Sequence, residues 1–230
     1  MTTFLIDLAT LAIILFCGWR GYRNGLIRGV FGVVTLIVAL IIANITAAAY
    51  SEEVSGALKP FVGGIVDSTF NDLIEEKEIE YEDIDYDNNS EEFKAIYTSL
   101  RRIGLPKSAA ISIAERTMDD YSEGFLADLI SEKLSSVLAF VALFGIAFLL
   151  LSIIFAVIGN LVNFVFSLPG LKQVDIIAGV AFGLTKGFLI VLTLATVVRY
   201  FGLVALSTIE ETTVLNYFVN HNLIANMLGI

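Results

Sequence analysis

The sequence contains 230 residues, 57% of them hydrophobic and 17% charged, with a formal net charge of −10 and a mean hydropathy of +0.81. So apolar a composition excludes an ordinary soluble domain, and the acidic balance excludes recognition of nucleic acid through a basic surface. The single cysteine, Cys17, excludes an intramolecular disulfide and is expected to pack as a small apolar residue.

Four apolar stretches approach or exceed the ~20 residues that cross a bilayer. They cover residues 4–19, 30–50, 134–166 and 174–206. The first stretch lacks a basic segment before it and a small-residue cleavage site after it, so we expect an uncleaved anchor rather than a signal peptide. The third contains no charged residue and would extend ~50 Å as one helix, so it must tilt, kink or project beyond the lipid.

The distribution of Lys and Arg predicts the orientation of the chain. Arg20, Arg23 and Arg28 follow the first stretch in a short loop, and Lys172 lies between the third and fourth stretches. Both connections are therefore expected in the cytoplasm, which places both termini outside. The long segment 51–133 then also lies outside, and its 20 acidic and 8 basic residues agree with that placement.

This outer segment is predicted to form a cap of short helices. Ser90 begins one helix, and Gly104 ends it after an apolar stripe. Pro106 suits the first turn of a second helix, and a third is expected from about Met118, continuing into the third apolar stretch. The cap contains no histidine, no cysteine and no glycine-rich phosphate loop, so we do not expect a catalytic domain there.

One part of the cap is strongly acidic, with 10 acidic residues among the 18 from 75 to 92. The alternating aspartates at 83–87 imitate the beginning of a calcium loop. However, Asn88 replaces the glycine of the turn, and Lys94 replaces the bidentate glutamate that closes such a site. We therefore expect a solvated acidic loop without a metal.

The tail, residues 207–230, has an amphipathic pattern. Thr212 or Thr213 can cap a helix, and apolar residues follow at nearly helical spacing. Because the tail carries no cation, packing against the outer ends of the bundle is favoured over binding to anionic lipid. His221, the only histidine, is expected to be inert.

A glycine pattern occurs twice in the chain, at an offset of 158 residues. Within each copy glycines recur every four residues, and Arg28 of the first copy matches Lys186 of the second. Glycines at this spacing share one helix face and let another backbone approach closely in lipid. The pattern predicts two similar halves whose glycine faces meet within a monomer or across a homodimer. The predicted packing glycines are Gly21, Gly25, Gly29, Gly179, Gly183 and Gly187.

Ionisable residues inside apolar helices are candidate functional groups. The candidates are Arg23, Arg28, Asp175 and Lys186. Arg28, Lys186 and Arg199 are expected to reach the lipid headgroups with their long side chains. No relay of Asp, Glu and His runs through the centre of the helices, which argues against a proton-coupled pump.

The remaining polar groups near the helix ends favour a structural role over a transport pathway. Asp7 is expected at the outer interface. Asp175 lies three residues from Lys172, a spacing that allows a surface ion pair. Asn160 and Asn163 are placed to form hydrogen bonds with the fourth helix.

The motifs around the repeated glycines resemble those of the colicin V production protein family of bacterial inner-membrane proteins. The similar features are four apolar helices, a basic loop Gly-x-Arg23-x-Gly-x-x-Arg28, and the more specific run Asp175-x-x-x-Gly-x-x-x-Gly-x-x-Lys186. The resemblance covers both helix pairs, whereas the acidic insert departs from short family members and suggests a longer, Gram-positive-type version. It implies a multi-pass protein of the bacterial cytoplasmic membrane, linked to toxin production or export and to envelope function, with no established catalytic residues.

We predict an all-α membrane protein with four transmembrane helices in two parallel-repeat pairs beneath an extracytoplasmic helical cap. Its regions are a first helix pair (1–50), the acidic outer insert (51–133), a second helix pair (134–206) and the tail (207–230). A non-enzymatic accessory or scaffold protein is favoured, without cofactor, metal or nucleic acid, and with the lipid bilayer and a second copy or a membrane protein as partners.

Two other classes of function are weighed against this one. A small channel or transporter is the alternative, disfavoured because the polar groups collect near the helix ends. A membrane enzyme is the least favoured class, because the sequence offers no nucleophile–base pair and no metal-ligand cluster.

Overall fold

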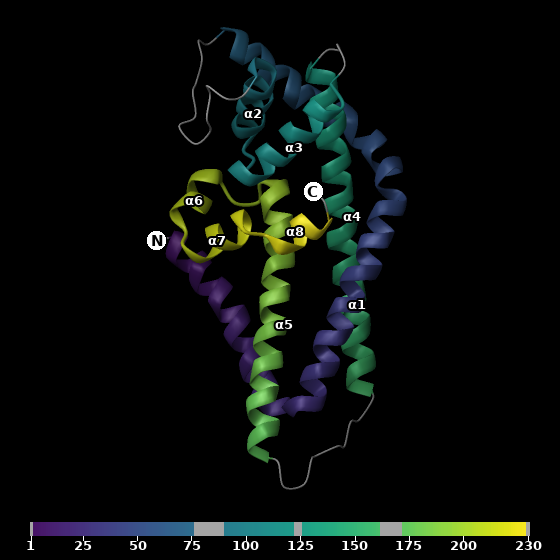
Figure 1. Ribbon diagram of the computed structural model, residues 1–230, viewed down its shortest axis with the longest axis vertical. Helices are drawn as coiled ribbons and strands as arrows, with labels where there is room; N and C mark the ends of the chain where they lie inside the picture. The colour runs from purple at the N-terminus through teal and green to yellow at the C-terminus, as the bar shows by residue number, and fades with distance from the viewer. Residues whose placement is uncertain (1, 76–89, 122–125, 162–171, 229–230) are drawn as a thin grey trace.

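The computed structural model describes residues 2–75, 90–121, 126–161 and 172–228, which form helices joined by short turns. Within these ranges there is no strand, so the prediction of an all-α fold is confirmed. Figure 1 shows long helices side by side beneath a cap of α2 and α3, with the small helices α6 to α8 lying across α5. The helices are α1 (Thr2–Glu75), α2 (Glu91–Ile103), α3 (Lys107–Asp119), α4 (Leu126–Leu161), α5 (Lys172–Phe201), α6 (Leu206–Glu211), α7 (Val214–Asn220) and α8 (Leu223–Leu228).

Helix α1 turns back on itself at Gly25. This residue has a φ of 73°, in the left-handed region that glycine adopts without steric cost. It divides α1 into a first limb, residues 2–24, and a second limb, residues 26–75. In Figure 1 the first limb descends from the N-terminus and the second limb climbs away from the turn. The loop expected between the first two apolar stretches is therefore reduced to one residue.

The first limb runs antiparallel to α5. Gly18 lies against Leu184, and Ile14 lies against Gly187, so residue numbers fall along α5 as they rise along the limb. The second limb begins beside α5, where Gly29 lies against Phe182, and then climbs away from that helix along α4 (Figure 1). Both limbs of α1 consequently contact α5.

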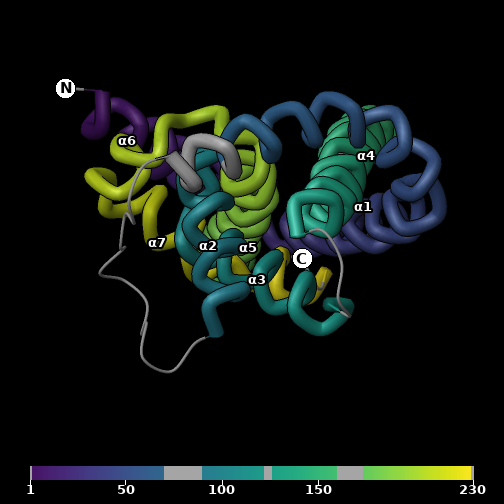
Figure 2. Tube along the Cα trace, turned by 90° about the horizontal axis from the view of Figure 1, so that it is seen from above, coloured from purple at the N-terminus to yellow at the C-terminus, as the bar shows by residue number. Residues whose placement is uncertain are grey.

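Helix α1 makes most of the contacts between the long helices. Helix α1 packs along both α4 and α5, which contact each other far less, and Figure 2 shows α4 and α5 standing apart. Ala39, Ala43 and Ala47 recur every four residues on the second limb and are fully buried, because small side chains allow a close helix approach. Among the described helices, α1, α4 and α5 are long and apolar enough to cross a membrane.

The first helix of the predicted cap is confirmed in detail. Ser90 Oγ accepts the Phe93 N–H at 3.2 Å at the beginning of α2, and Gly104, with a φ of 102°, ends the helix. Pro106 is the N-cap of α3 rather than a residue of its first turn. The expected beginning of a third helix near Met118 is wrong, because Met118 still belongs to α3.

Two predicted boundaries of the long helices are also revised, and one predicted continuation is confirmed. Helix α1 continues through residue 50 to Glu75, so the outer insert is not separated from the second limb at that point. Helix α4 begins at Leu126 and runs unbroken into the third apolar stretch, as expected. Helix α5 ends at Phe201 rather than at 206, because Gly202 adopts a φ of 58° that does not continue a helix.

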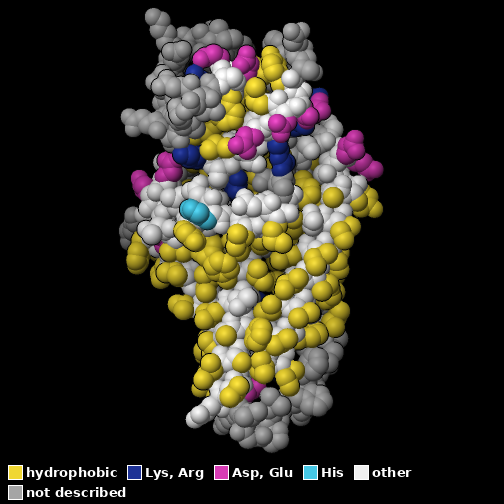
Figure 3. All heavy atoms as spheres, viewed as in Figure 1, with side chains coloured by type: hydrophobic (Ala, Val, Ile, Leu, Met, Phe, Trp, Pro, Cys, Tyr) yellow, Lys and Arg dark blue, Asp and Glu magenta, His cyan; other side chains and the backbone are white. Residues whose placement is uncertain are grey.

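The surface divides into an apolar belt and a charged cap. On the face seen in Figure 3, hydrophobic side chains cover the long helices below the level of the histidine, and acidic and basic side chains gather above it. Ile146, Leu149 and Ile153 of α4 are among the large apolar side chains that the fold leaves exposed. Such a belt is what a lipid environment would cover.

Candidate functional site

The first limb and α5 approach closely where they cross. A Cβ built on Gly21 would lie 2.9 Å from the Gly183 Cα, and a Cβ built on Gly179 would lie 2.9 Å from the Gly25 Cα. Contacts this short between backbones leave room only for glycine. Four of the six glycines selected from the sequence therefore meet within one chain.

The other two selected glycines lie at the edges of this contact. A Cβ on Gly187 would lie 2.8 Å from the Ile14 Cα of the first limb. A Cβ on Gly29 would lie 3.0 Å from the Phe182 Cβ and 3.6 Å from the Gly179 Cα, so the tightest contact of this glycine is with a side chain.

The two copies of the glycine pattern differ in backbone conformation. The offset of 158 residues equates Gly25 with Gly183. Gly25 forms the left-handed turn of α1, whereas Gly183 lies inside the uninterrupted helix α5. The arrangement of the chain as two parallel-repeat halves stays a prediction.

Asp175 stabilises the turn at Gly25. Its Oδ1 accepts the Leu26 N–H at 2.9 Å, and this N–H belongs to the first turn of the second limb, where it has no acceptor in its own helix. The partial positive charge of a helix N-terminus also favours a carboxylate there. Asp175 was predicted to pair with Lys172, but the Lys172 side chain lies outside the described residues.

Asp7 has the equivalent role at the other end of the first limb. Its carboxylate oxygens accept the N–H groups of Thr213, Val214 and Leu215 at 2.9, 3.0 and 3.1 Å. Asp7 therefore caps α7 from a distant part of the chain and joins the first limb to the tail. The sequence suggested Thr213 as one candidate cap, but its side chain makes no capping bond.

The tail packs on the bundle, as predicted. It contacts α5 and the first limb, and Phe218 is buried against them. Thr212 Oγ1, the other candidate cap, accepts the Asn216 N–H at 3.2 Å. The fully buried Asn222 donates from Nδ2 to the Leu192 carbonyl oxygen of α5 at 3.0 Å, an anchor that the sequence analysis missed.

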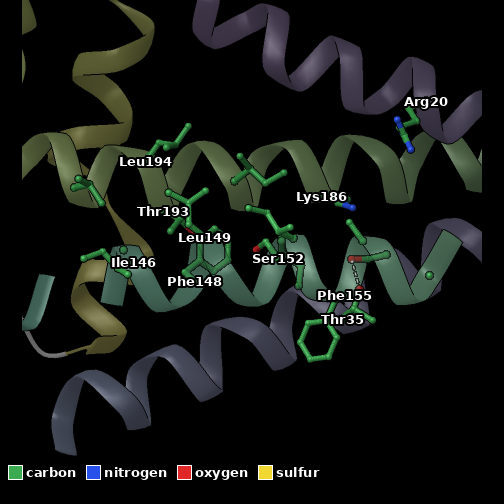
Figure 4. A pocket seen from close by; sticks show the side chains of 18 of the residues that line it. Arg20, Thr35, Ile146, Phe148, Leu149, Ser152, Phe155, Lys186, Thr193 and Leu194 are labelled. Atoms are coloured by element: carbon green, nitrogen blue, oxygen red, sulfur yellow. Dashed lines mark hydrogen bonds between the residues drawn. The ribbon is translucent and has the colours of Figure 1, made fainter. Parts of the chain in front are cut away.

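A cavity of about 1020 Å³ lies between α4 and α5, with the second limb forming part of its lining. Arg20, Arg28 and Lys186 line its end nearest the Gly25 turn. Figure 4 shows Lys186 projecting from α5 into the space, with Arg20 of the first limb at the same end. Lys186 Nζ lies beside Gly32, where a built Cβ would be 3.6 Å away. This arrangement could not be predicted from the sequence, because no pattern specifies how the first limb packs on α5 or how wide a gap separates α5 from α4.

Two other cations lie outside the cavity lining. The Arg23 guanidinium carbon lies 5.4 Å from the centre of the Trp19 ring, within the range of a cation–π interaction. Arg199 is 3% exposed and lies over the Tyr200 ring. The expectation that Arg199 reaches the headgroups is therefore wrong, because residues of the cap cover this end of α5.

Neither the candidate metal ligands nor the candidate asparagines form a site among the described residues. In the described ranges, no group of three His, Cys, Asp or Glu residues could hold a metal ion. The calcium-like aspartates at 83–87 lie outside the described residues, as do Asn163 and the side chain of Asn160. The described polar groups can thus cap helices and present positive charge to a ligand.

Comparison with known proteins identifies a family. A family model described as colicin V production protein matches residues 6–75 and 109–222. The matched ranges contain α1, α4 and α5 except for a few terminal residues, and both aspartate caps. No curated protein and no solved structure matches the chain.

Proposed function

We propose, from the premise that this chain belongs to the colicin V production protein family, that it acts as a non-enzymatic accessory protein of the bacterial cytoplasmic membrane. Family membership confirms the resemblance drawn from the sequence, and the long apolar helices fit a membrane protein. In this role the bundle supports toxin production or export, or envelope function, by presenting a rigid surface to a membrane-protein partner or to a second copy.

The observation that carries the proposal is the use of Asp7 and Asp175 in helix junctions. Asp175 accepts one backbone N–H at the Gly25 turn, and Asp7 accepts three at the start of α7. A carboxylate held by backbone donors fixes the position of two elements and is already satisfied. These contacts support a structural role over a coupled transport pathway.

The proposed topology has four crossings, made by the two limbs of α1 and by α4 and α5. The Gly25 turn faces the cytoplasm, because Arg20, Arg23 and Arg28 lie beside it and short cationic connections remain inside. Both termini and the acidic cap then lie outside. The glycine contact between the first limb and α5 serves as the helix-packing motif of this bundle, within one chain.

A small transporter is the second candidate function, and one observation favours it. The cavity between α4 and α5 brings Arg20, Arg28 and Lys186 to one end, so an anionic solute would meet complementary charge there.

Reconstitution in liposomes tests the two candidates. We expect no solute or ion flux from the purified protein, and co-purification of a membrane partner or a stable oligomer. Flux that falls in Lys186→Gln and Asp175→Asn but persists in Arg23→Gln would overturn the accessory role in favour of transport. Arg23 is the matched control because its side chain lies over Trp19 rather than in the cavity.

A further inference from the structure

We propose that the cavity between α4 and α5 binds an anionic phospholipid. The phosphate lies at Arg20, Arg28 and Lys186, and the acyl chains lie along the apolar walls formed by α4 and α5. This inference concerns a ligand of the bundle and does not depend on the role in toxin production.

The charge at one end of the cavity identifies the headgroup. Arg20, Arg28 and Lys186 line that end, and no acidic residue is among the described residues that line the cavity. None of the three forms an ion pair within the described ranges. Lys186 Nζ lies beside Gly32, which is one turn beyond Arg28 on the same helix face. Three converging cations in an apolar bundle repel one another unless an anion lies between them.

The length and opening of the cavity identify the rest of the ligand. Its lining runs along α4 from Val141 to Gly159, a rise of ~27 Å that approaches the thickness of the hydrocarbon core. The lining residues Ile146, Leu149 and Ile153 are 59%, 60% and 56% exposed, so the cavity opens on the apolar belt. A lipid can therefore enter sideways from the bilayer without crossing a polar surface.

The charge favours a lipid over a helix of a partner or a second copy. An apolar helix would leave the three cations without a counter-charge, which is costly away from water. A phospholipid supplies both the anion and the flexible apolar chains.

Native mass spectrometry of the full chain in mild detergent tests the proposal. The protein is titrated with dioleoyl phosphatidylglycerol and, separately, with dioleoyl phosphatidylcholine. Each cation near a lipid surface contributes about fivefold in affinity, so we expect a preference of about 100-fold for the anionic lipid. The variant Arg20→Gln/Arg28→Gln/Lys186→Gln is expected to lose that preference, whereas Arg23→Gln is expected to keep it.

A second variant keeps the test valid if the triple variant does not fold. Ser152 lines the cavity, and its Oγ is buried without a hydrogen-bond partner, so Ser152→Phe is expected to fill the space and weaken binding of both lipids at least tenfold. Unchanged phosphatidylglycerol binding in Ser152→Phe would overturn the proposal. Competition by glycerol 3-phosphate as strong as that by the lipid would also overturn the proposal, because it indicates a site for a free anion. A dimer that is unaffected by either lipid but is dissociated by Ser152→Phe would overturn it in favour of a second copy in the cavity.

Discussion

Replacing Gly183 by Ala, with Gly64→Ala as the matched control, tests the contact between the first limb and α5. Both glycines lie inside long helices. A Cβ at Gly183 would lie 3.0 Å from the Gly21 Cα and 3.1 Å from the Gly18 Cα, whereas a Cβ at Gly64 would meet nothing within 4 Å.

The expected magnitude follows from the difference between the two sites. Alanine is favoured over glycine in a helix interior by about 1 kcal/mol, and this gain is common to both variants. Forcing a methyl group into a close-packed contact costs about 1–3 kcal/mol, and at Gly183 the opposing atoms are backbone, which cannot rotate away. We therefore expect Gly183→Ala to be less stable than Gly64→Ala by about 1–3 kcal/mol.

The free energy of unfolding in mixed detergent micelles is the measurement. Helix content follows global unfolding, and emission from Trp19, the only tryptophan, reports on the first limb beside Gly21. Equal unfolding free energies for Gly183→Ala and Gly64→Ala would refute the close contact between the first limb and α5.

Three further predictions concern the polar groups of the bundle. Asp175→Ala leaves the Leu26 N–H without its acceptor and is expected to lower the unfolding free energy by about 1–2 kcal/mol. Asp175→Asn keeps an oxygen and is expected to lose less, so equal unfolding free energies for the two variants would contradict the capping role. Asp7→Ala removes the acceptor of three N–H groups, so hydrogen exchange is expected to rise in residues 214–220 while α4 stays protected. Unchanged exchange in residues 214–220 would contradict the junction between Asp7 and α7. Replacing Arg20, Arg23 and Arg28 together by Gln is expected to scramble the topology shown by reporter fusions; an unaltered reporter pattern would refute the proposed orientation.

Features set by local sequence could be predicted. The helix from Ser90 to Gly104 is bounded by a side-chain cap and a left-handed glycine, and both signals lie within the segment itself. The apolar stretches likewise predicted α4 and α5, since length and composition decide whether a helix can cross lipid. The end of α5 at Gly202 was missed, because an isolated glycine in an apolar run does not reveal its φ.

The helix junctions could not be predicted, because their partners are far apart in the chain. Asp175 and Leu26 are separated by 149 residues, and Asp7 and Thr213 by 206. Spacing along one helix suggested Lys172 as the partner of Asp175, and it gave no sign that the N-terminus of the second limb also contacts this aspartate. An aspartate in an apolar helix indicates that a partner exists, but only the packing of the limbs identifies it.

The cavity and the Gly25 turn could not be predicted either, for the same reason. The glycine spacing did not distinguish Gly25, whose φ of 73° makes the turn, from Gly183 inside a helix. The exposure of Arg20 and Lys186 to one cavity depends on how far α4 stands from α5, which is a property of the whole bundle.

The most direct test of the account is an oxidative cross-link between the native Cys17 and a cysteine introduced by Gly187→Cys. A Cβ at Gly187 would lie 3.0 Å from the Cys17 Cβ and 2.8 Å from the Ile14 Cα. The first limb and α5 must therefore move slightly apart to admit the new side chain, and this shift brings the pair toward the separation of about 3.5–4.5 Å found in disulfides. The account predicts loss of both free thiols in a monomeric band on a non-reducing gel, with Gly64→Cys as a negative control. A dimeric band, or two thiols that stay free, would contradict the packing of the first limb against α5 within one chain.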